Sequence, residues 1–181
     1  WAYNNVGDWL WVDGICARQL MNKNMDDLFR LAQLYRPQSV GIEVSGQQGG
    51  FIPWIQSQML ERNIYFPLAS DSDNNAPGIR PNTNKMVRFN TVLPLFKARK
   101  LYFPIEKKTG SVLSEAMNEL TLVAVGGFKS KHDDFLDTIS MLSLLQPWKP
   151  SEEVTMQQKD DGMWETIENT VEVDRRSSYI I

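Results

Sequence analysis

The chain has 181 residues, of which 42% are hydrophobic, and a formal net charge of −3 at pH 7, which predicts one moderate domain or one domain with a tail. It contains no run of eighteen apolar residues and does not begin with a basic stretch and an apolar block, so we expect no transmembrane helix and no secretory signal. Its lone cysteine, Cys16, excludes an internal disulfide and a cysteine-based zinc site, and fits a reducing intracellular setting.

Charge is unevenly distributed along the chain. Residues 78–131 carry ten Lys or Arg side chains against three Glu, whereas residues 151–181 carry three against eight acids. A basic middle segment can contact phosphate groups, and an acidic tail cannot. The simpler alternative is a solvated basic face followed by a disordered tail. The chain begins at Trp1 rather than at a methionine, and we expect it to be a fragment of a longer protein.

The first elements are predicted to be a pair of strands and a helix. Residues 1–3 and 8–18 have the composition of strands and are joined by a turn. Asn24 is expected to cap a helix over residues 25–35, with acids in its first turn. The Arg36-Pro37 dipeptide ends this helix because a residue before proline disfavours the helical conformation.

The middle of the chain alternates between apolar strands and helices. Residues 39–44 and 64–68 are short apolar runs typical of buried strands, and a helix is expected between them over 50–62. A polar loop precedes a basic helix over residues 85–99. Pro94 lies inside that helix and predicts a kink or a break.

The last part of the domain is predicted to be mainly helical. A short strand is expected at 101–104, a helix within 110–125 and a flexible loop at 126–130. An apolar helix with an acidic start follows over 132–145. The alternation of strands and helices predicts an α/β fold with a mainly parallel sheet that begins with an antiparallel pair. We therefore expect a domain at 1–150 and an acidic C-terminal tail at 151–181.

Two distant segments place acidic side chains where their charge is energetically unfavourable unless something compensates it. Glu43 ends the apolar run Val-Gly-Ile-Glu, and three acids, Asp133, Asp134 and Asp137, crowd the first turns of an apolar helix. Asp134 and Asp137 share a helix face, so their charges repel. A divalent cation compensates such repulsion, and Mg²⁺ and Mn²⁺ prefer carboxylate oxygens. If the strand end faces the helix start, these acids can hold metal for phosphodiester hydrolysis.

A structural interpretation competes with the metal site. The acids at the helix start can be ordinary first-turn residues that interact favourably with the helix dipole. Glu43 can pair with a nearby arginine. His132, the only histidine, is a candidate general base or a residue that bonds locally at the helix start.

The combination of Gly-Ile-Glu at a strand end, a basic helix after a loop, and His-Asp-Asp-Phe-Leu-Asp at the start of an apolar helix resembles the nuclease domain of tailed-phage large terminase subunits. The resemblance covers about residues 1–148. It implies an α/β fold of the RNase H type, a mixed sheet flanked by helices. It also implies that Glu43, Asp134 and Asp137 are catalytic residues that bind Mg²⁺ or Mn²⁺ at a two-metal site.

The activity implied by the resemblance is endonucleolytic cutting of double-stranded DNA during phage genome packaging. The implied partners are double-stranded DNA, the terminase ATPase domain, the portal protein and the small terminase subunit, with no membrane, in the host cell cytoplasm. The ATPase motor is not expected here, because the chain has no phosphate-loop motif. The family's first strand, with its aspartate, is also missing from the pattern, so this fragment is expected to be poorly active alone.

Basic residues before, within and after the predicted 85–99 helix are candidate contacts to the DNA backbone. They are Arg80, Lys85, Arg88, Lys97, Arg99 and Lys100. Two other functions remain open from the sequence. The first is another nuclease of the same fold, such as a resolvase or a transposase. The second is a non-catalytic module that docks on a portal or capsid protein.

Overall fold

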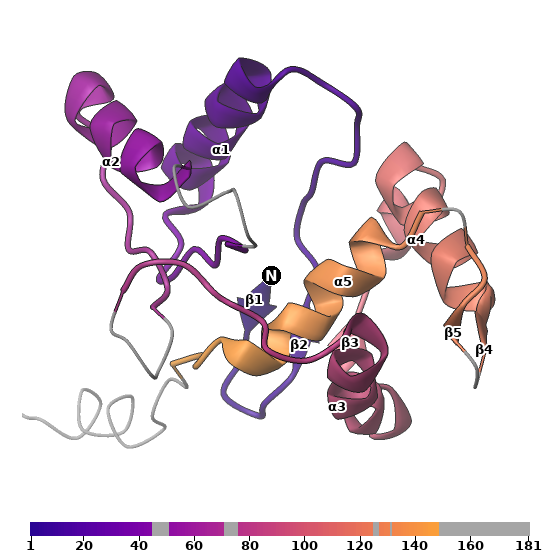
Figure 1. The fold of residues 1–181 in the computed structure, drawn as a ribbon. Coiled ribbons are helices and arrows are strands. Elements are labelled where there is room, and N and C mark those ends of the chain that lie inside the picture. The colour runs from indigo at the N-terminus through magenta and orange to yellow at the C-terminus, as the bar shows by residue number, and fades with distance from the viewer. Residues whose placement is uncertain (45–50, 71–75, 125–126, 131, 149–181) are drawn as a thin grey trace, which may run out of the picture.

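The computed structural model describes residues 1–44, 51–70, 76–124, 127–130 and 132–148, and these ranges combine helices with short strands (Figure 1). This mixture is compatible with the predicted α/β class. Residues 45–50 and the predicted acidic tail at 151–181 lie outside the described residues.

A three-stranded sheet forms one part of the fold. It contains β1 (Ala2–Tyr3), β2 (Trp9–Leu10) and β3 (Leu101–Tyr102), in that order. The strands β1 and β2 are antiparallel, as the sequence predicts, and β2 and β3 are parallel. The predicted long strand over 8–18 is wrong in extent, because the chain is a strand only at Trp9–Leu10.

A second strand pairing lies at residues 39–44. Val40 forms a parallel bridge with Leu68, and Glu43 forms one with Ile79. Both predicted strands, 39–44 and 64–68, therefore take part in parallel pairing, although only through isolated bridges. The partner of Glu43 comes from the loop before the basic helix, which was not predicted to pair.

Two helices pack beside this second pairing. They are α1 (Met21–Tyr35) and α2 (Phe51–Arg62), and their buried faces meet around Met25, Phe29 and Ile55. The prediction that Asn24 caps the first helix is wrong, because α1 begins at Met21. The Asn24 side chain instead accepts a hydrogen bond from Gln19, 2.7 Å away.

The other helices cover the three-stranded sheet. They are α3 (Lys85–Lys97), α4 (Ser111–Thr121) and α5 (Asp134–Met141), the last continued by a 3-10 turn, η3 (Leu142–Leu144). Figure 1 shows α5 in the middle of the molecule. The Asn84 side chain caps α3 by accepting a hydrogen bond from the Val87 N–H. Of the predicted kink or break at Pro94, the break does not occur, because α3 continues to Lys97.

Two short elements surround α4. A 3-10 turn, η2 (Ile105–Lys107), precedes it, and a hairpin of β4 (Val123–Ala124) and β5 (Gly127–Phe128) follows it. The hairpin lies where the sequence predicts the end of a helix and a flexible loop. Gly127, the first residue of β5, has φ +134°, a backbone angle that other residues rarely adopt.

Two hydrophobic clusters result from this arrangement. One joins the three-stranded sheet to α3, α4 and α5 through residues such as Trp9, Phe89 and Leu136. The other joins α1 and α2 to the second strand pairing around Phe29 and Phe66.

Candidate functional site

The start of α5 carries the predicted acidic cluster. Asp133 occupies the N-cap position, and Asp134 is the first helical residue and is exposed. A carboxylate in the first turn interacts favourably with the helix dipole, so local structure alone tolerates Asp134. Its exposure also leaves it accessible to a cation or to a substrate.

Asp137 lies on the buried side of the same helix and is held by cations. Arg88 donates a short hydrogen bond to one of its oxygens, and the Lys85 Nζ lies 3.4 Å from the other. The Ser140 hydroxyl, 3.3 Å from Asp137 Oδ1, adds a further bond. Because both oxygens of Asp137 have cationic partners, the structure gives this carboxylate a role in joining α3 to α5.

Lys85 links this buried pair to the surface acids. Its Nζ lies 3.1 Å from Asp133 Oδ1 as well as near Asp137. Partial burial acts to lower the pKa of the Lys85 ammonium, but the hydrogen bond to Asp133 and the charge of Asp137 raise it above its ordinary value. Lys85 therefore stays charged at neutral pH and offsets the repulsion within the acidic cluster.

Glu119 on α4 supports the start of α5, a role that was not predicted from the sequence. Its side chain is fully buried, and Oε2 accepts a hydrogen bond of 3.0 Å from the Leu136 N–H. Burial raises the pKa of this carboxyl, and its Oε1 has no hydrogen-bond partner among the described residues. An acid three residues after Ala116 and six after Leu113, both buried, was the available signal.

Glu43 lies away from this cluster. It is half-buried in the parallel bridge with Ile79. A Cβ placed at Gly41 would lie 2.7 Å from Ile79 Cδ1 and 3.1 Å from Leu145 Cδ2, so both side chains border Gly41. The segment that carries Glu43 therefore lies beside Leu145, which follows η3, whereas Asp134 begins α5.

The described residues do not by themselves fit the predicted metal site. Within the ranges that the structure covers, no group of three or more His, Cys, Asp or Glu side chains is placed to hold a metal ion. Glu43, Asp134 and Asp137 are all described, so the structure does not bring them together. The use of Asp137 by Arg88 and Lys85 is a physical reason for this.

The predicted DNA contacts divide into two groups. Arg80, Lys97 and Arg99 are exposed. Arg88 is only 6% exposed and is paired with Asp137, which removes it from the outer surface. Lys100 is held by Asp8, with an Nζ–Oδ1 distance of 2.7 Å.

An apolar groove of about 630 Å³ separates the two hydrophobic clusters. One wall comes from β1, with Trp1 and Tyr3, and another from Ser39 and Val40. The groove therefore lies between the edges of two separate strand pairings.

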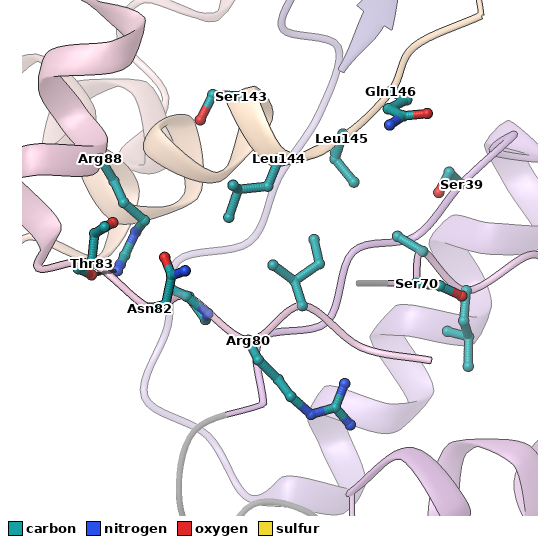
Figure 2. A pocket seen from close by; sticks show the side chains of 14 residues that line it. Ser39, Ser70, Arg80, Asn82, Thr83, Arg88, Ser143, Leu144, Leu145 and Gln146 are labelled. Carbon is teal, nitrogen blue, oxygen red and sulfur yellow. Dashed lines mark hydrogen bonds between the residues drawn. The ribbon is translucent and has the colours of Figure 1, made fainter. Parts of the chain in front are cut away.

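A second cavity, of about 670 Å³, is polar. Figure 2 shows Arg80, Asn82 and Thr83 on one of its sides and Ser143 and Gln146 on another. No Asp or Glu is among the described residues that line it. Its lining therefore suits an anion better than a cation.

No family model, curated protein or solved structure matches this chain. Within the described ranges, no helix is both long and apolar enough to span a membrane. The functional assignment accordingly depends on the residues and the geometry described above.

Proposed function

We propose that the chain is the larger part of an RNase H-like nuclease domain of the large-terminase type, whose sheet is completed by one more strand in the apolar groove. The observation that carries this proposal is the pair of strand edges on either side of the groove. An apolar groove between two strand edges suits the insertion of an extended segment, because main-chain hydrogen bonds can form on both of its sides.

The first edge belongs to β1. Tyr3 is opposite Trp9, and the Asn4 N–H donates to the Asp8 carbonyl across the same ladder. In an antiparallel pair, neighbouring residues direct their backbone groups to opposite sides. The N–H and C=O of Tyr3 are thus directed away from β2, on the side of the groove.

The second edge belongs to residues 39–44. The backbone groups of Val40, Ile42 and Val44 bond to the segments at 67–69 and 79. The alternation of a strand directs the backbone groups of Gly41 and Glu43 to the opposite side. Glu43 is therefore on the edge that an inserted strand would pair with.

The proposed enzyme needs a metal ion, and the missing strand is consistent with the lack of a complete metal site among the described residues. The described residues supply Glu43 and the exposed Asp134 as carboxylates, but no group of three. We propose that the added strand brings a further carboxylate beside Glu43 and repacks the groove, so that an Mg²⁺ or Mn²⁺ site forms only in the completed sheet. Such an ion would supply activation of water and charge stabilisation for phosphodiester hydrolysis.

The chain's own residues have separate parts in this proposal. Glu43 and Asp134 are ligands. Asp137, predicted from the sequence as an auxiliary ligand, would act here by positioning α5 against α3 through Arg88. Exposed Lys97 and Arg99 would contact the DNA backbone without sequence preference.

The biological setting of the proposal follows from the resemblance alone. The domain would cut double-stranded DNA during genome packaging in the host cell cytoplasm. It would work beside a terminase ATPase domain, the portal protein and the small terminase subunit.

The test is plasmid nicking by a longer form of the protein that includes residues preceding Trp1, with Mn²⁺ or Mg²⁺. We expect metal-dependent cleavage that Glu43→Gln and Asp134→Asn each abolish. Glu61→Gln is the matched control, because Glu61 is an exposed acid on α2. Cleavage that is absent in the longer protein, or unchanged by both site variants, would refute the proposal and favour a docking module.

A further inference from the structure

The polar cavity beside the end of α5 has the composition of a phosphate site. Its lining includes four hydroxyl side chains, two amide side chains and two arginines. These polar residues are Ser39, Ser70, Thr83, Ser143, Asn82, Gln146, Arg80 and Arg88. Hydroxyls, amides and guanidinium groups all donate hydrogen bonds, and a phosphate offers only acceptors at neutral pH.

Positive charge at this cavity is only partly neutralised. Arg80 donates to the backbone carbonyls of Gly78 and Pro77, at 3.3 and 3.4 Å, and forms no ion pair with any described carboxylate. Arg88 is only 6% exposed. Asp137 pairs with its guanidinium, but the Arg88 Nε has no hydrogen-bond partner among the described residues. An anion in the cavity would gain from the exposed Arg80 guanidinium, and none of the described residues that line the cavity is a carboxylate.

The cavity is also accessible and large enough for more than an ion. The side chains of Arg80, Asn82, Thr83 and Ser143 are exposed. Its volume of about 670 Å³ lies within the usual range for small-molecule sites, about 300–1,000 Å³. Figure 2 shows Arg80, Asn82 and Thr83 on one segment and Ser143 on a second segment across the cavity.

We infer that this cavity binds the phosphate group of a nucleotide. This inference rests on the proposed function, because the nuclease proposal makes DNA the source of the phosphate. The binding itself needs no metal ion, because the donors are side chains of this chain. Two sources share this chemistry, a free mononucleotide and a nucleotide within a DNA strand.

The experiment is a titration of the isotope-labelled protein with thymidine 5′-monophosphate in EDTA, followed by amide chemical shifts. We expect saturable shifts at Ser39, Ser70, Asn82, Thr83 and Ser143, and no saturable shifts with thymidine. Arg80→Gln should weaken binding about tenfold, the effect of losing one charge-assisted hydrogen bond.

The matched control is Arg18→Gln. Arg18 is exposed, does not line the cavity and loses the same charge. It should leave the affinity unchanged. Thermal unfolding of both variants should match that of the parent, because both side chains are exposed.

A parallel titration with an eight-nucleotide oligothymidine distinguishes the two sources of phosphate. Stronger shifts at the same residues would identify a nucleotide within a strand as the ligand, and weaker shifts would identify a free nucleotide. Three results would overturn the inference: thymidine binding as tightly as thymidine 5′-monophosphate, Arg18→Gln weakening binding as much as Arg80→Gln, or no saturation with either phosphate ligand. A protein that nicks plasmid DNA with a metal ion but binds neither phosphate ligand in this cavity would refute the phosphate site and leave the nuclease proposal intact.

Discussion

Replacing Asp137 by asparagine should distinguish a structural carboxylate from a metal ligand. The substitution keeps the shape of the side chain and removes its charge. In the structure, Asp137 is buried and accepts from Arg88, which is itself only 6% exposed. The substitution would leave a buried guanidinium without its carboxylate.

The magnitude follows from the burial of this pair. Breaking a buried ion pair by removing one partner costs about 3–5 kcal/mol. The exposed end of the cluster adds little, because the Lys85 side chain is 45% exposed and surface pairs contribute about 0–1 kcal/mol. We therefore expect Asp137→Asn to lower the free energy of unfolding by about 3–5 kcal/mol, a large part of a typical domain's stability.

Asp134→Asn is the matched comparison. Asp134 lies on the same helix, is exposed and forms no ion pair within the described ranges. Losing its interaction with the helix dipole should cost about 0.3–1 kcal/mol. The two substitutions are chemically identical and separated by three residues, so the difference between them reports the environment alone.

Urea unfolding followed by tryptophan fluorescence measures both variants, since the chain has six tryptophans and two of them, Trp9 and Trp11, are buried. We expect the midpoint of Asp137→Asn to fall by about 1 M or more, given slopes of about 1–3 kcal/mol per M. The double variant Arg88→Met with Asp137→Leu should regain much of the loss. Equal stabilities for Asp137→Asn and Asp134→Asn, or a gain for Asp137→Asn, would refute the ion-pair reasoning.

Three further predictions concern buried or strained residues. Burial raises the pKa of Glu119 above its ordinary 4.5, so the folded state retains a proton that the unfolded state releases. Stability should then fall as pH rises from about 4.5 through the folded pKa, and Glu119→Gln should flatten this fall in urea midpoints measured across pH. Hydrogen bonds from Lys100 and Asn4 lower the pKa of Asp8 below 3.8, so the stability from this residue is present above that pH and lost as pH falls through the folded pKa. Asp8→Asn should therefore make the acid side of the same profile less steep, and an unchanged profile would count against this pair. A Cβ on Gly78 would lie 2.5 Å from Val44 Cγ2 at φ +100°, so Gly78→Ala should lower stability by about 1–3 kcal/mol. A Cβ on Gly127 would be strained by the backbone angle but would meet no atom within 4 Å, so Gly127→Ala should lower stability less than Gly78→Ala when the thermal unfolding of both variants is compared.

Local patterns in the sequence predicted most of the helices. The apolar spacing in residues 25–35 identified α1, because one buried face produces a period that is independent of the partner. Helix ends were less predictable. The competing bond from Gln19 to Asn24 and the continuation of α3 through Pro94 both depend on local contacts that composition does not reveal.

The candidate site was predicted less well than the helices. The acids at the start of α5 were identified, but the pairing of Asp137 with Arg88 joins residues 49 positions apart. Such a contact depends on how α3 packs against α5, and no short-range pattern encodes it. Glu119 was missed for the same reason, since its bond to Leu136 crosses from one helix to another.

The measurement that tests the central claim most directly is the broadening of amide signals by bound Mn²⁺ in a protein that includes residues preceding Trp1. A paramagnetic ion broadens the signals of nearby nuclei, so one shared site should broaden the amides of Glu43 and Asp134 at the same low ion concentration. We predict this joint broadening and its loss in Glu43→Gln. Broadening near only one of the two acids, or only at concentrations that also affect exposed acids such as Glu61, would contradict the proposed metal-dependent nuclease site.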